Sequence, residues 1–420
     1  MTGALEPGRQ VTEPALAPGR ETTEPALAPG RQATEPPRTL VVTGHFPPEH
    51  GGVQTFTWEF LSRLPPDRLV VVAPAWPGAA EFDAGLDYPV IRRHGYALFG
   101  GLSRLVAEHR LSVGWITAMA PFGLYAPLIR RAGLSRLVAS THGQEIGWVR
   151  ALPTRLALRR VSRALDAVSY LSEVTLPELR AGLHPGTPLM QLAGGVHAER
   201  FADDTAGLAI RRRYRLGTGP VLISVSRLVR RKGHDLLLRV WPAVLARFPD
   251  AKLLIVGDGP MRNRLAEQAG REFAGSVVLT GEVPAAELAA HYAAADVFVL
   301  PCRDDRRGLQ TEGLGLSTLE AAAAGLPVVV GRSGGSPASL LDSRTGLLVD
   351  PHSPEEVTDA LLRLLADPGW AGRLGAAGRR WVRERWSWED ATGRLIALLR
   401  GELPAEQPAD PDPAAPARID

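Results

Sequence analysis

The sequence predicts an α/β protein built from two consecutive parallel sheets. Short apolar runs alternate with amphipathic helical patterns, and the runs recur roughly every 25–30 residues, which is typical of βαβ units. The alternation stops at a glycine-containing turn, 193–196, and then starts again. Because single cores rarely grow beyond ~250–300 residues, a chain of 420 residues also favours two folded units. We expect two Rossmann-like domains that face each other across a cleft.

The expected elements follow in order. The first unit should contain strands at 39–43, 69–73, 90–92, 113–117, 137–140 and 167–170. Its helices should lie at 53–64, 101–110, 124–132, 153–165 and 173–181. The second unit should contain strands at 221–225, 252–256, 277–279, 297–300 and 327–330, with helices between them and a last helix at 386–400. Ligands of such sheets bind at the carboxyl ends of the strands, so the loops there are the candidate functional segments.

The two ends of the chain differ in composition from the rest. Residues 1–37 repeat the unit TEPALAPGR and hold seven of the 36 prolines, and residues 402–420 hold five more. Such segments bury too little apolar surface to fold, so we predict disordered tails. The expected organisation is a tail at 1–37, an N-terminal domain at 38–200, a C-terminal domain at 201–385, a terminal helix at 386–401 that packs back on the N-terminal domain, and a tail at 402–420.

The folded region is basic. Residues 1–37 carry a net charge of −2 and residues 402–420 a net charge of −4, so the overall +3 leaves +9 on residues 38–401. A surface of this sign favours anionic partners such as phosphates or acidic lipids. Nucleic acid is disfavoured, because there is no zinc-finger spacing, aromatic RNA-binding motif or basic tract.

Hydropathy and cysteine content point to the cytoplasm. Mean hydropathy is −0.04, and the longest apolar runs, such as 69–73 and 297–300, are far shorter than the ~18 residues of a membrane-spanning helix. The N-terminus has no basic stretch followed by an apolar one, so we expect no signal peptide. Cys302 is the only cysteine, which fits a reducing compartment.

A basic loop follows the strand predicted at 221–225. Its sequence is SRLVRRKGHD at 226–235, and a helix is expected to follow. Arg227 and Lys232 would therefore lie beside a helix N-terminus, where two cations suit a diphosphate. The alternative is a solvated loop, but Lys232 is one of only two lysines among 48 cationic residues.

Two glutamates bracket a glycine-rich helix start in EGLGLSTLE at 312–320. Carboxylates bind sugar hydroxyls well because each accepts several hydrogen bonds. Glu312 and Glu320 are about two turns apart, so both could face the cleft at different depths. The alternative is that Glu312 caps the helix and Glu320 lies on the surface.

Two further loops follow strands of the first unit. Gly52, in FPPEHGGV at 46–53, would let backbone amides approach an anion at a helix N-terminus, or mark an ordinary turn. His142, in STHGQE at 140–145, follows a strand and is either functional or structural. A nicotinamide enzyme is disfavoured because GDGPMR at 257–262 lacks the dinucleotide fingerprint. We also expect no metal site, since Cys302 has no ligand-spaced companions and the only Asp-x-Asp lies at 410–412.

The helix expected at 153–165 has a cationic face. At 100° per residue, one sector holds Arg155, Leu156, Arg159, Arg160 and Arg163, whereas its apolar residues point the other way. Arginines with a leucine among them suit an anionic membrane surface, and the alternative is a solvated face.

Together the Arg227…Lys232 pair and the Glu312-x7-Glu320 pattern resemble the retaining glycosyltransferases of family 4, which have the GT-B fold. The resemblance spans about 39–388, with further support from 46–54, 140–148, 308–320 and WSWE at 386–389. Within the family the chain is most similar to the actinobacterial GDP-mannose-dependent mannosyltransferases that extend phosphatidylinositol monomannoside. His45 and Gln310 stand where acids are expected in close relatives, which would affect acceptor or sugar choice.

The resemblance implies roles for individual residues. It makes His142, Arg227, Lys232 and Glu312 the catalytic set, with His142 on the transferred sugar and the two cations on the diphosphate. The nucleotide-sugar site would comprise Gly52, Arg227, Lys232, Gly257, Val283, Glu312, Gly313, Leu314, Gly315 and Glu320, with Glu320 on the ribose.

The expected activity is metal-independent transfer of a hexose, namely mannose from GDP-mannose, to a glycolipid with retention of configuration. We expect no cofactor, and a peripheral location on the inner face of the plasma membrane. The alternatives are a UDP-sugar donor, a polysaccharide or polyprenyl acceptor, a sugar-nucleotide epimerase, and a non-catalytic nucleotide-sugar-binding scaffold. Oligomeric state does not follow from the sequence.

Overall fold

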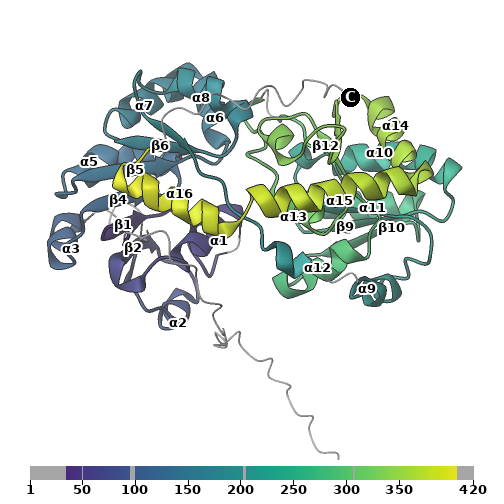
Figure 1. Ribbon diagram of the computed structural model, residues 1–420, viewed down its shortest axis with the longest axis horizontal. Helices are drawn as coiled ribbons and strands as arrows, with labels where there is room; N and C mark the ends of the chain where they lie inside the picture. Colours follow the sequence, from purple (N-terminus) through teal and green to yellow (C-terminus); the bar gives the residue numbers. More distant parts are fainter. Residues whose placement is uncertain (1–34, 50, 95–99, 202–204, 306–307, 404–420) are drawn as a thin grey trace, which may run out of the picture. The chain divides into compact units, whose positions relative to one another are not determined.

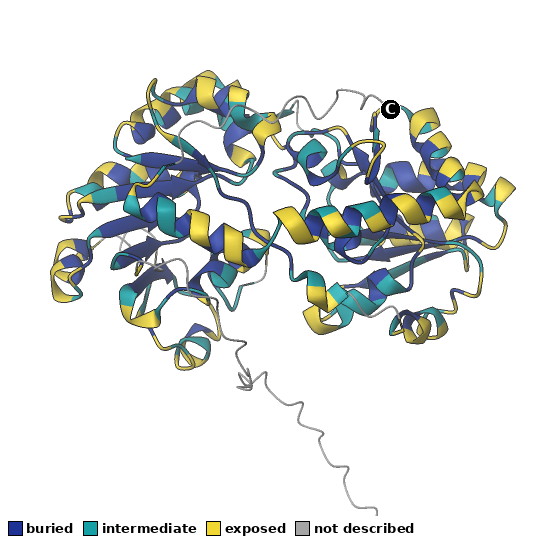
Figure 2. Ribbon diagram, in the orientation of Figure 1, coloured by how far each residue is buried: buried dark blue, intermediate teal, exposed yellow. Residues whose placement is uncertain are grey.

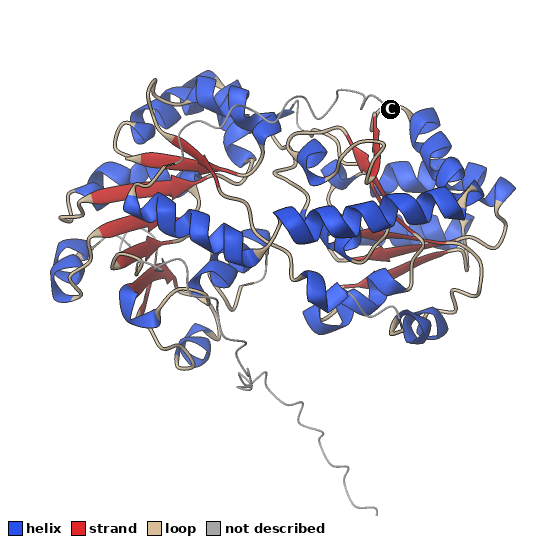
Figure 3. Ribbon diagram, in the orientation of Figure 1, coloured by secondary structure: helices blue, strands red, loops and turns tan. Residues whose placement is uncertain are grey.

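The computed structural model describes residues 35–49, 51–94, 100–201, 205–305 and 308–403. The two predicted tails therefore fall almost entirely outside the described residues. Within the described residues the chain forms two parallel sheets with helices packed against them. Figure 1 labels the elements along the chain, and Figure 3 distinguishes helices from strands. No helix in these ranges has the length and apolar character needed to cross a bilayer.

The first sheet has seven strands within the described residues. Their order across the sheet is β3 (Val90–Arg93), β2 (Leu69–Pro74), β1 (Thr39–Val42), β4 (Val113–Ile116), β5 (Arg136–Ser140), β6 (Ala167–Tyr170) and β7 (Leu189–Gln191). The connections contain α1 (Gly52–Leu61), α2 (Ala79–Asp83), α3 (Leu102–Glu108), α4 (Met119–Phe122), α5 (Ala126–Arg130), α6 (Gln144–Arg150), α7 (Leu152–Ser162) and α8 (Leu176–Gly182).

The second sheet has six strands within the described residues. Their order is β10 (Val277–Gly281), β9 (Lys252–Val256), β8 (Val221–Val225), β11 (Val297–Leu300), β12 (Val328–Gly331) and β13 (Gly346–Val349). Its helices are α9 (Gly207–Arg213), α10 (His234–Arg247), α11 (Arg262–Glu272), α12 (Ala285–Ala293), α13 (Leu316–Ala323), α14 (Pro354–Ala366) and α15 (Pro368–Arg385). The predicted pair of Rossmann-like sheets is confirmed.

Each sheet is buried on both faces, as Figure 2 shows. In β1, Leu40 and Val42 belong to one core cluster while Val41 belongs to another. The strands of the second sheet divide in the same way: Ile255 of β9 faces one cluster, and Leu254 faces the other. Burial on both faces explains why these strands are nearly continuous apolar runs rather than alternating ones.

The terminal helix α16 (Trp388–Arg400) packs on the first sheet, although it follows the second in sequence. Trp388 and Leu395 join the core cluster that covers one face of that sheet. The Arg136 Nε atom on β5 donates a hydrogen bond to the Leu398 carbonyl (3.1 Å). The helix begins where the Ser387 hydroxyl accepts a hydrogen bond from the backbone N–H of Asp390, a standard N-cap.

Several elements differ from the sequence-based expectation. The patterns did not predict β7, β13, α2 or α6, all of which are short; α6 also contains an internal glycine. The helix expected at 124–132 is divided between a 3₁₀ turn (Gly123–Tyr125) and α5, where Pro127 has no backbone N–H to donate. Helix α7 begins at Leu152, one residue earlier than expected.

The strand order places the functional loops. The direction of winding reverses between β1 and β4 in the first sheet and between β8 and β11 in the second. At such a switch point neighbouring connections leave in opposite directions and open a crevice at the carboxyl ends of the strands. The basic loop 226–233 and the glutamate loop 301–315 follow β8 and β11, so both lie at the switch point of the second sheet.

Candidate active site

The basic loop after β8 lies against the end of β11. It forms a 3₁₀ turn (Arg230–Lys232), and Gly233, with φ of 78°, precedes α10. A Cβ atom at Gly233 would lie 2.2 Å from the Pro301 carbonyl oxygen, so only glycine allows this approach. Arg227 is exposed and Lys232 is buried. Both cations lie at a strand–helix junction as predicted, whereas their role as diphosphate ligands stays a prediction.

Glu312 is held by two cations of that loop. Its Oε2 atom lies 2.7 Å from Lys232 Nζ and 2.5 Å from Arg231 Nη1. Burial alone would raise the pKa of Glu312, but the charges of Lys232 and Arg231 lower this pKa to about 2. The carboxylate is therefore ionised at neutral pH. The Cys302 thiol lies 3.7 Å from the same oxygen, and burial together with that carboxylate raises the pKa of Cys302 to about 12.

Glu320 lies on α13 and is paired with a tyrosine. The Tyr292 hydroxyl on α12 donates a hydrogen bond to Glu320 Oε2 (2.9 Å). Burial raises the pKa of Glu320 to about 7, against the opposing effect of the Tyr292 hydrogen bond. Glu320 is thus half-buried and paired with Tyr292, rather than a freely solvated surface residue. Capping by Glu312 is wrong, since Gly315 precedes α13 and no side chain caps that helix.

The imidazole ring of His142 is neutral, and its hydrogen bond identifies the nitrogen that carries the proton. Its Nε2 atom lies 2.6 Å from the Thr117 carbonyl, which can only accept, so Nε2 carries the hydrogen and Nδ1 remains an acceptor. Burial lowers the pKa of His142 to about 4. The backbone N–H of His142 donates to Glu145 Oε2 (2.9 Å), and the other oxygen of that carboxylate accepts from the Ala120 N–H (3.1 Å). Buried Glu145 thus joins the loops after β4 and β5.

The loops of His142 and Glu312 are in direct contact. A Cβ atom at Gly143 would lie 2.8 Å from Gly313 Cα, and one at Gly313 would lie 2.7 Å from the His142 carbonyl oxygen. The structure therefore brings His142, Lys232, Glu312 and Gly313 together. These residues come from both sheets, and they combine a neutral acceptor nitrogen, a buried carboxylate and an ammonium group.

The other predicted binding residues have separate structural roles. Gly52 is the first residue of α1, with no atom within 4 Å of its Cβ position. Gly257 is required because a Cβ atom would lie 2.1 Å from the Ser226 carbonyl oxygen, and its N–H already donates to Gly281 (2.9 Å). Val283 is half-buried and packs against a core cluster of the second sheet. Leu314 is buried, so only its backbone could reach a ligand.

Sequence reasoning gave no role to three residues of the site. Arg231 stands next to Lys232 in the basic loop, so the sequence shows its charge but does not indicate that it pairs with Glu312. Tyr292 has no signal in the sequence, because it lies 28 positions from Glu320. Glu145 stands only three positions after His142, but its second partner, the Ala120 N–H, lies 25 positions earlier.

The chain is similar to known glycosyltransferases. Residues 219–367 match the family model described as "Glycosyl transferases group 1". The chain is 43% identical to the GDP-mannose-dependent alpha-(1-6)-phosphatidylinositol monomannoside mannosyltransferase of Mycolicibacterium smegmatis, over 88% of this chain and 100% of that protein. It is 36% identical to a GDP-mannose-dependent monoacylated alpha-(1-6)-phosphatidylinositol monomannoside mannosyltransferase of Corynebacterium glutamicum, over 87% and 98%. The chain belongs to the group 1 glycosyl transferases.

Solved structures with this fold confirm the architecture. The Anabaena HepE protein in complex with UDP covers 87% of this glycosyltransferase and 100% of its own chain, with a TM-score of 0.74 and 16% identity. WaaG, a glycosyltransferase involved in lipopolysaccharide biosynthesis, has a TM-score of 0.64 at 17% identity, over 86% and 100%. The predicted GT-B fold is therefore correct.

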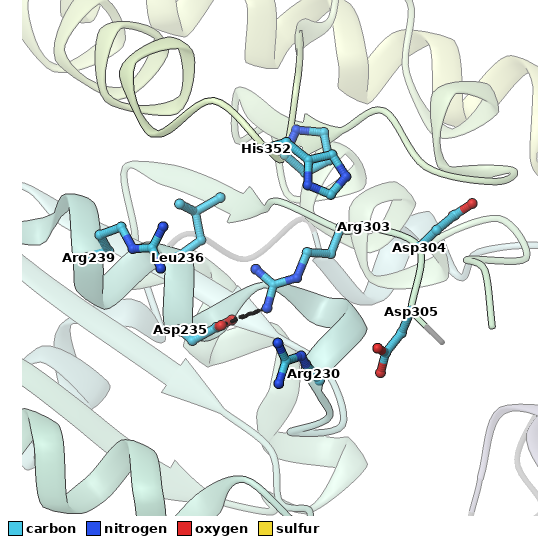
Figure 4. Close-up of a pocket in the computed structure, with 9 residues that line it drawn as sticks. Arg230, Asp235, Leu236, Arg239, Arg303, Asp304, Asp305 and His352 are labelled. Atoms are coloured by element: carbon cyan, nitrogen blue, oxygen red, sulfur yellow. Dashed lines mark hydrogen bonds and ion pairs between the residues drawn. The ribbon is translucent and has the colours of Figure 1, made fainter. Parts of the chain in front are cut away.

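A hollow of about 400 Å³ in the glycosyltransferase lies beside Arg230 of the basic loop (Figure 4). Its lining includes Arg230, Asp235, Arg239, Arg303 and His352, and none of the predicted site residues. The Arg303 guanidinium donates to both carboxylate oxygens of Asp235 (2.7 and 2.6 Å), so these two charges offset each other. The hollow therefore does not coincide with the predicted site residues. Among the described residues no cluster of His, Cys, Asp or Glu could hold a metal ion.

The raised pKa of Glu320 makes the stability of the glycosyltransferase depend on pH. Burial raises the pKa of Glu320 from 4.5 to about 7, so the folded state favours the neutral acid. This contribution to stability is complete below pH 4.5 and is lost as the pH rises through about 7. We expect Glu320→Gln to remove about 3 kcal/mol of the resulting decline in the free energy of unfolding. Urea denaturation at about pH 5 and about pH 8 measures it.

Glu356→Gln is the matched control, because Glu356 lies exposed in the first turn of α14. In Glu356→Gln the free energy of unfolding should differ between the two pH values as much as it does in the wild type. An unchanged difference in Glu320→Gln would mean that Glu320 is not the group responsible.

Proposed function

We propose that this glycosyltransferase transfers mannose from GDP-mannose to phosphatidylinositol monomannoside, with retention of the anomeric configuration. The observation that carries the proposal is the 43% identity over the whole length of the Mycolicibacterium relative, whose name states this donor and acceptor. Two contacts support it: the ion pair between Lys232 and Glu312, which joins a carboxylate suited to sugar hydroxyls with a cation suited to a diphosphate, and the backbone contact of His142–Gly143 with Glu312–Gly313.

The proposed chemistry uses side chains of the chain itself. The bond between the mannose C1 atom and the diphosphate oxygen breaks while C1 bonds to an acceptor hydroxyl oxygen on the same face. The acceptor proton passes to the leaving phosphate oxygen, and GDP departs. Arg227 and Lys232 offset the charge that develops on the diphosphate, which is the part a divalent metal plays elsewhere. Glu312 orients the mannose, and Glu320 accepts hydrogen bonds from the ribose.

The test is incubation of the purified protein with radiolabelled GDP-mannose and phosphatidylinositol monomannoside in vesicles, with and without EDTA. We expect a labelled dimannoside with an α linkage, formed equally well in EDTA. UDP-glucose and GDP-glucose serve as competing donors. Binding of GDP-mannose without a labelled lipid would favour a non-catalytic scaffold, and activity lost in EDTA would exclude the metal-independent route.

We further propose that the protein docks on the inner face of the plasma membrane through α7. Leu156 on this helix is 56% exposed, whereas Leu158 and Val161 are buried against the core, as the helical pattern predicts. Leu152, which we expected to precede the helix, is its first residue and is 58% exposed. Arg159, Arg160 and Arg163 are exposed, and Arg155 is half-buried.

A neighbouring element carries two more exposed leucines, which supports the proposal. A Cβ atom at Gly123 would lie 2.9 Å from a methyl group of Val161, so the 3₁₀ turn before α5 lies beside α7. Leu124 and Leu128 of that segment are exposed as well. Leucines on two neighbouring elements with arginines around them suit a bilayer, where the leucines enter the acyl boundary and the arginines meet lipid phosphates.

Removing three of the arginines should weaken membrane binding. Each cation near an anionic surface contributes about 1 kcal/mol, so Arg155→Ser/Arg159→Ser/Arg163→Ser should lower vesicle affinity by tenfold or more. Co-sedimentation with vesicles containing phosphatidylinositol measures it. Arg239→Ser/Arg264→Ser/Arg271→Ser removes the same charge from exposed helix positions of the second sheet and should bind like wild type. Equal binding by both variants would exclude α7 as the contact.

A further inference from the structure

One face of α6 lies directly against the loop that carries Glu312. Gly143, which precedes the helix, is followed at spacings of four and three by Gly147 and Arg150, so the three residues share one face. This face, the α6 seat, contacts residues 308–313, which lead from β11 into Glu312 and Gly313.

Gly143 and Gly147 have no side chains, so the backbone of residues 308–313 packs directly against α6. A Cβ atom at Gly147 would lie 2.2 Å from the Leu309 carbonyl oxygen and 2.9 Å from the carbonyl carbon. The corresponding position at Gly143, where φ is 94°, lies 2.8 Å from Gly313 Cα. Both contacts are with backbone atoms, which cannot rotate away as a flexible side chain can. Any larger residue at Gly147 must displace the loop.

Arg150 holds the same loop by hydrogen bonds. Its Nη1 atom donates to the Gly308 carbonyl (2.6 Å) and to Asp304 Oδ2 (3.1 Å). Its Nε and Nη2 atoms donate to the two carboxylate oxygens of Glu178 on α8 (2.7 and 3.0 Å), which orients the guanidinium. The other oxygen of Asp304 accepts from the Ser333 hydroxyl (2.6 Å). Arg150 thus connects α6 and α8 of the first sheet with the β11 loop of the second.

We propose that Gly147 and Arg150 are positioning residues for glycosyl transfer: the α6 seat fixes the backbone of 308–313 and thereby sets Glu312 and Gly313 beside His142. Lys232 and Arg231 bind Glu312 from within the second sheet, whereas His142 belongs to the first. Contacts within one sheet and its loops therefore do not determine the distance between the Glu312 carboxylate and His142. The α6 seat does so, because its contacts join the two loops directly. The proposal rests on the proposed function for the identity of the sugar donor.

Gly147→Ala tests whether the close packing of Gly147 against the Leu309 carbonyl is required. Alanine favours a helix over glycine by about 1 kcal/mol, so the helix itself is not weakened and any loss comes from the displaced loop. We expect kcat for mannosyl transfer to fall tenfold or more, with unchanged affinity for GDP and faster amide hydrogen exchange in peptides that cover 308–313. Gly270→Ala on α11 is the matched control, because no atom lies within 4 Å of its Cβ position, and it should behave like wild type.

Arg150→Met tests the hydrogen-bonded part and covers the case in which Gly147→Ala does not fold. It should also lower kcat more than it raises KM for GDP-mannose and speed exchange in 308–313, and Arg150→Lys should not restore kcat. Wild-type kcat in either folded variant would overturn the proposal, as would unchanged exchange in both. If wild-type protein transfers no mannose, the proposed function fails, while the exchange comparison still decides whether the α6 seat holds the loop.

Discussion

Replacing Lys232 by alanine should lower turnover by about a hundredfold or more, the usual loss when one preorganised charge-stabilising group is removed. Lys232 is buried, and its ammonium lies 2.7 Å from Glu312 Oε2. An ammonium has three N–H donors, so it can keep this contact and still donate to a diphosphate. Turnover of GDP-mannose at saturating acceptor measures the effect.

The same substitution should lower stability as well, because a buried carboxylate then keeps only Arg231 as a partner. Breaking a buried ion pair by removing one member typically costs about 3–5 kcal/mol, so urea denaturation must accompany the rate measurement. Lys252→Ala is the natural control: it removes the chain's other lysine, whose Nζ donates to the Gly275 carbonyl at the far edge of the second sheet. Near-normal turnover in a folded Lys232→Ala protein would remove Lys232 from the diphosphate site.

Glu312→Gln should lower turnover by about a hundredfold while affinity for GDP changes little, because Glu312 is assigned to the sugar and not to the nucleotide. The amide keeps the shape of the side chain but loses the charge that Lys232 and Arg231 hold in place. Calorimetric titration with GDP and steady-state kinetics separate the two quantities. Glu356→Gln, on the surface of α14, should leave both unchanged.

The two substitutions should not be additive. Lys232 and Glu312 are in direct contact, so the double variant should lose less activity than the product of the single losses. A GDP affinity that falls as much as the rate would reassign Glu312 to the nucleotide. Normal turnover with normal GDP binding would exclude Glu312 from the site altogether.

Much of the fold follows from local pattern. Strands such as β8 and β11 are apolar runs because parallel sheets are covered on both faces, and that property depends only on residue type and order. The basic and glycine-rich loops after them are equally local, so Lys232 and Glu312 lie beyond the carboxyl ends of strands as predicted, whereas the pairing of those two strands is seen only in the structure. The short elements β7, β13 and α6 lack such a pattern, since a few residues or an internal glycine give no clear period.

The sequence by itself therefore determined the two-sheet fold, the residue types of the site and the apolar and cationic sides of α7. The tertiary structure alone decided which groups are partners: Arg231 with Glu312, Tyr292 with Glu320, and the α6 seat with residues 308–313. The physical reason is that the charge and shape of a side chain are local properties. Which atoms surround that side chain depends on how two sheets and their helices pack, and Arg150 meets Gly308 across 158 positions of the chain.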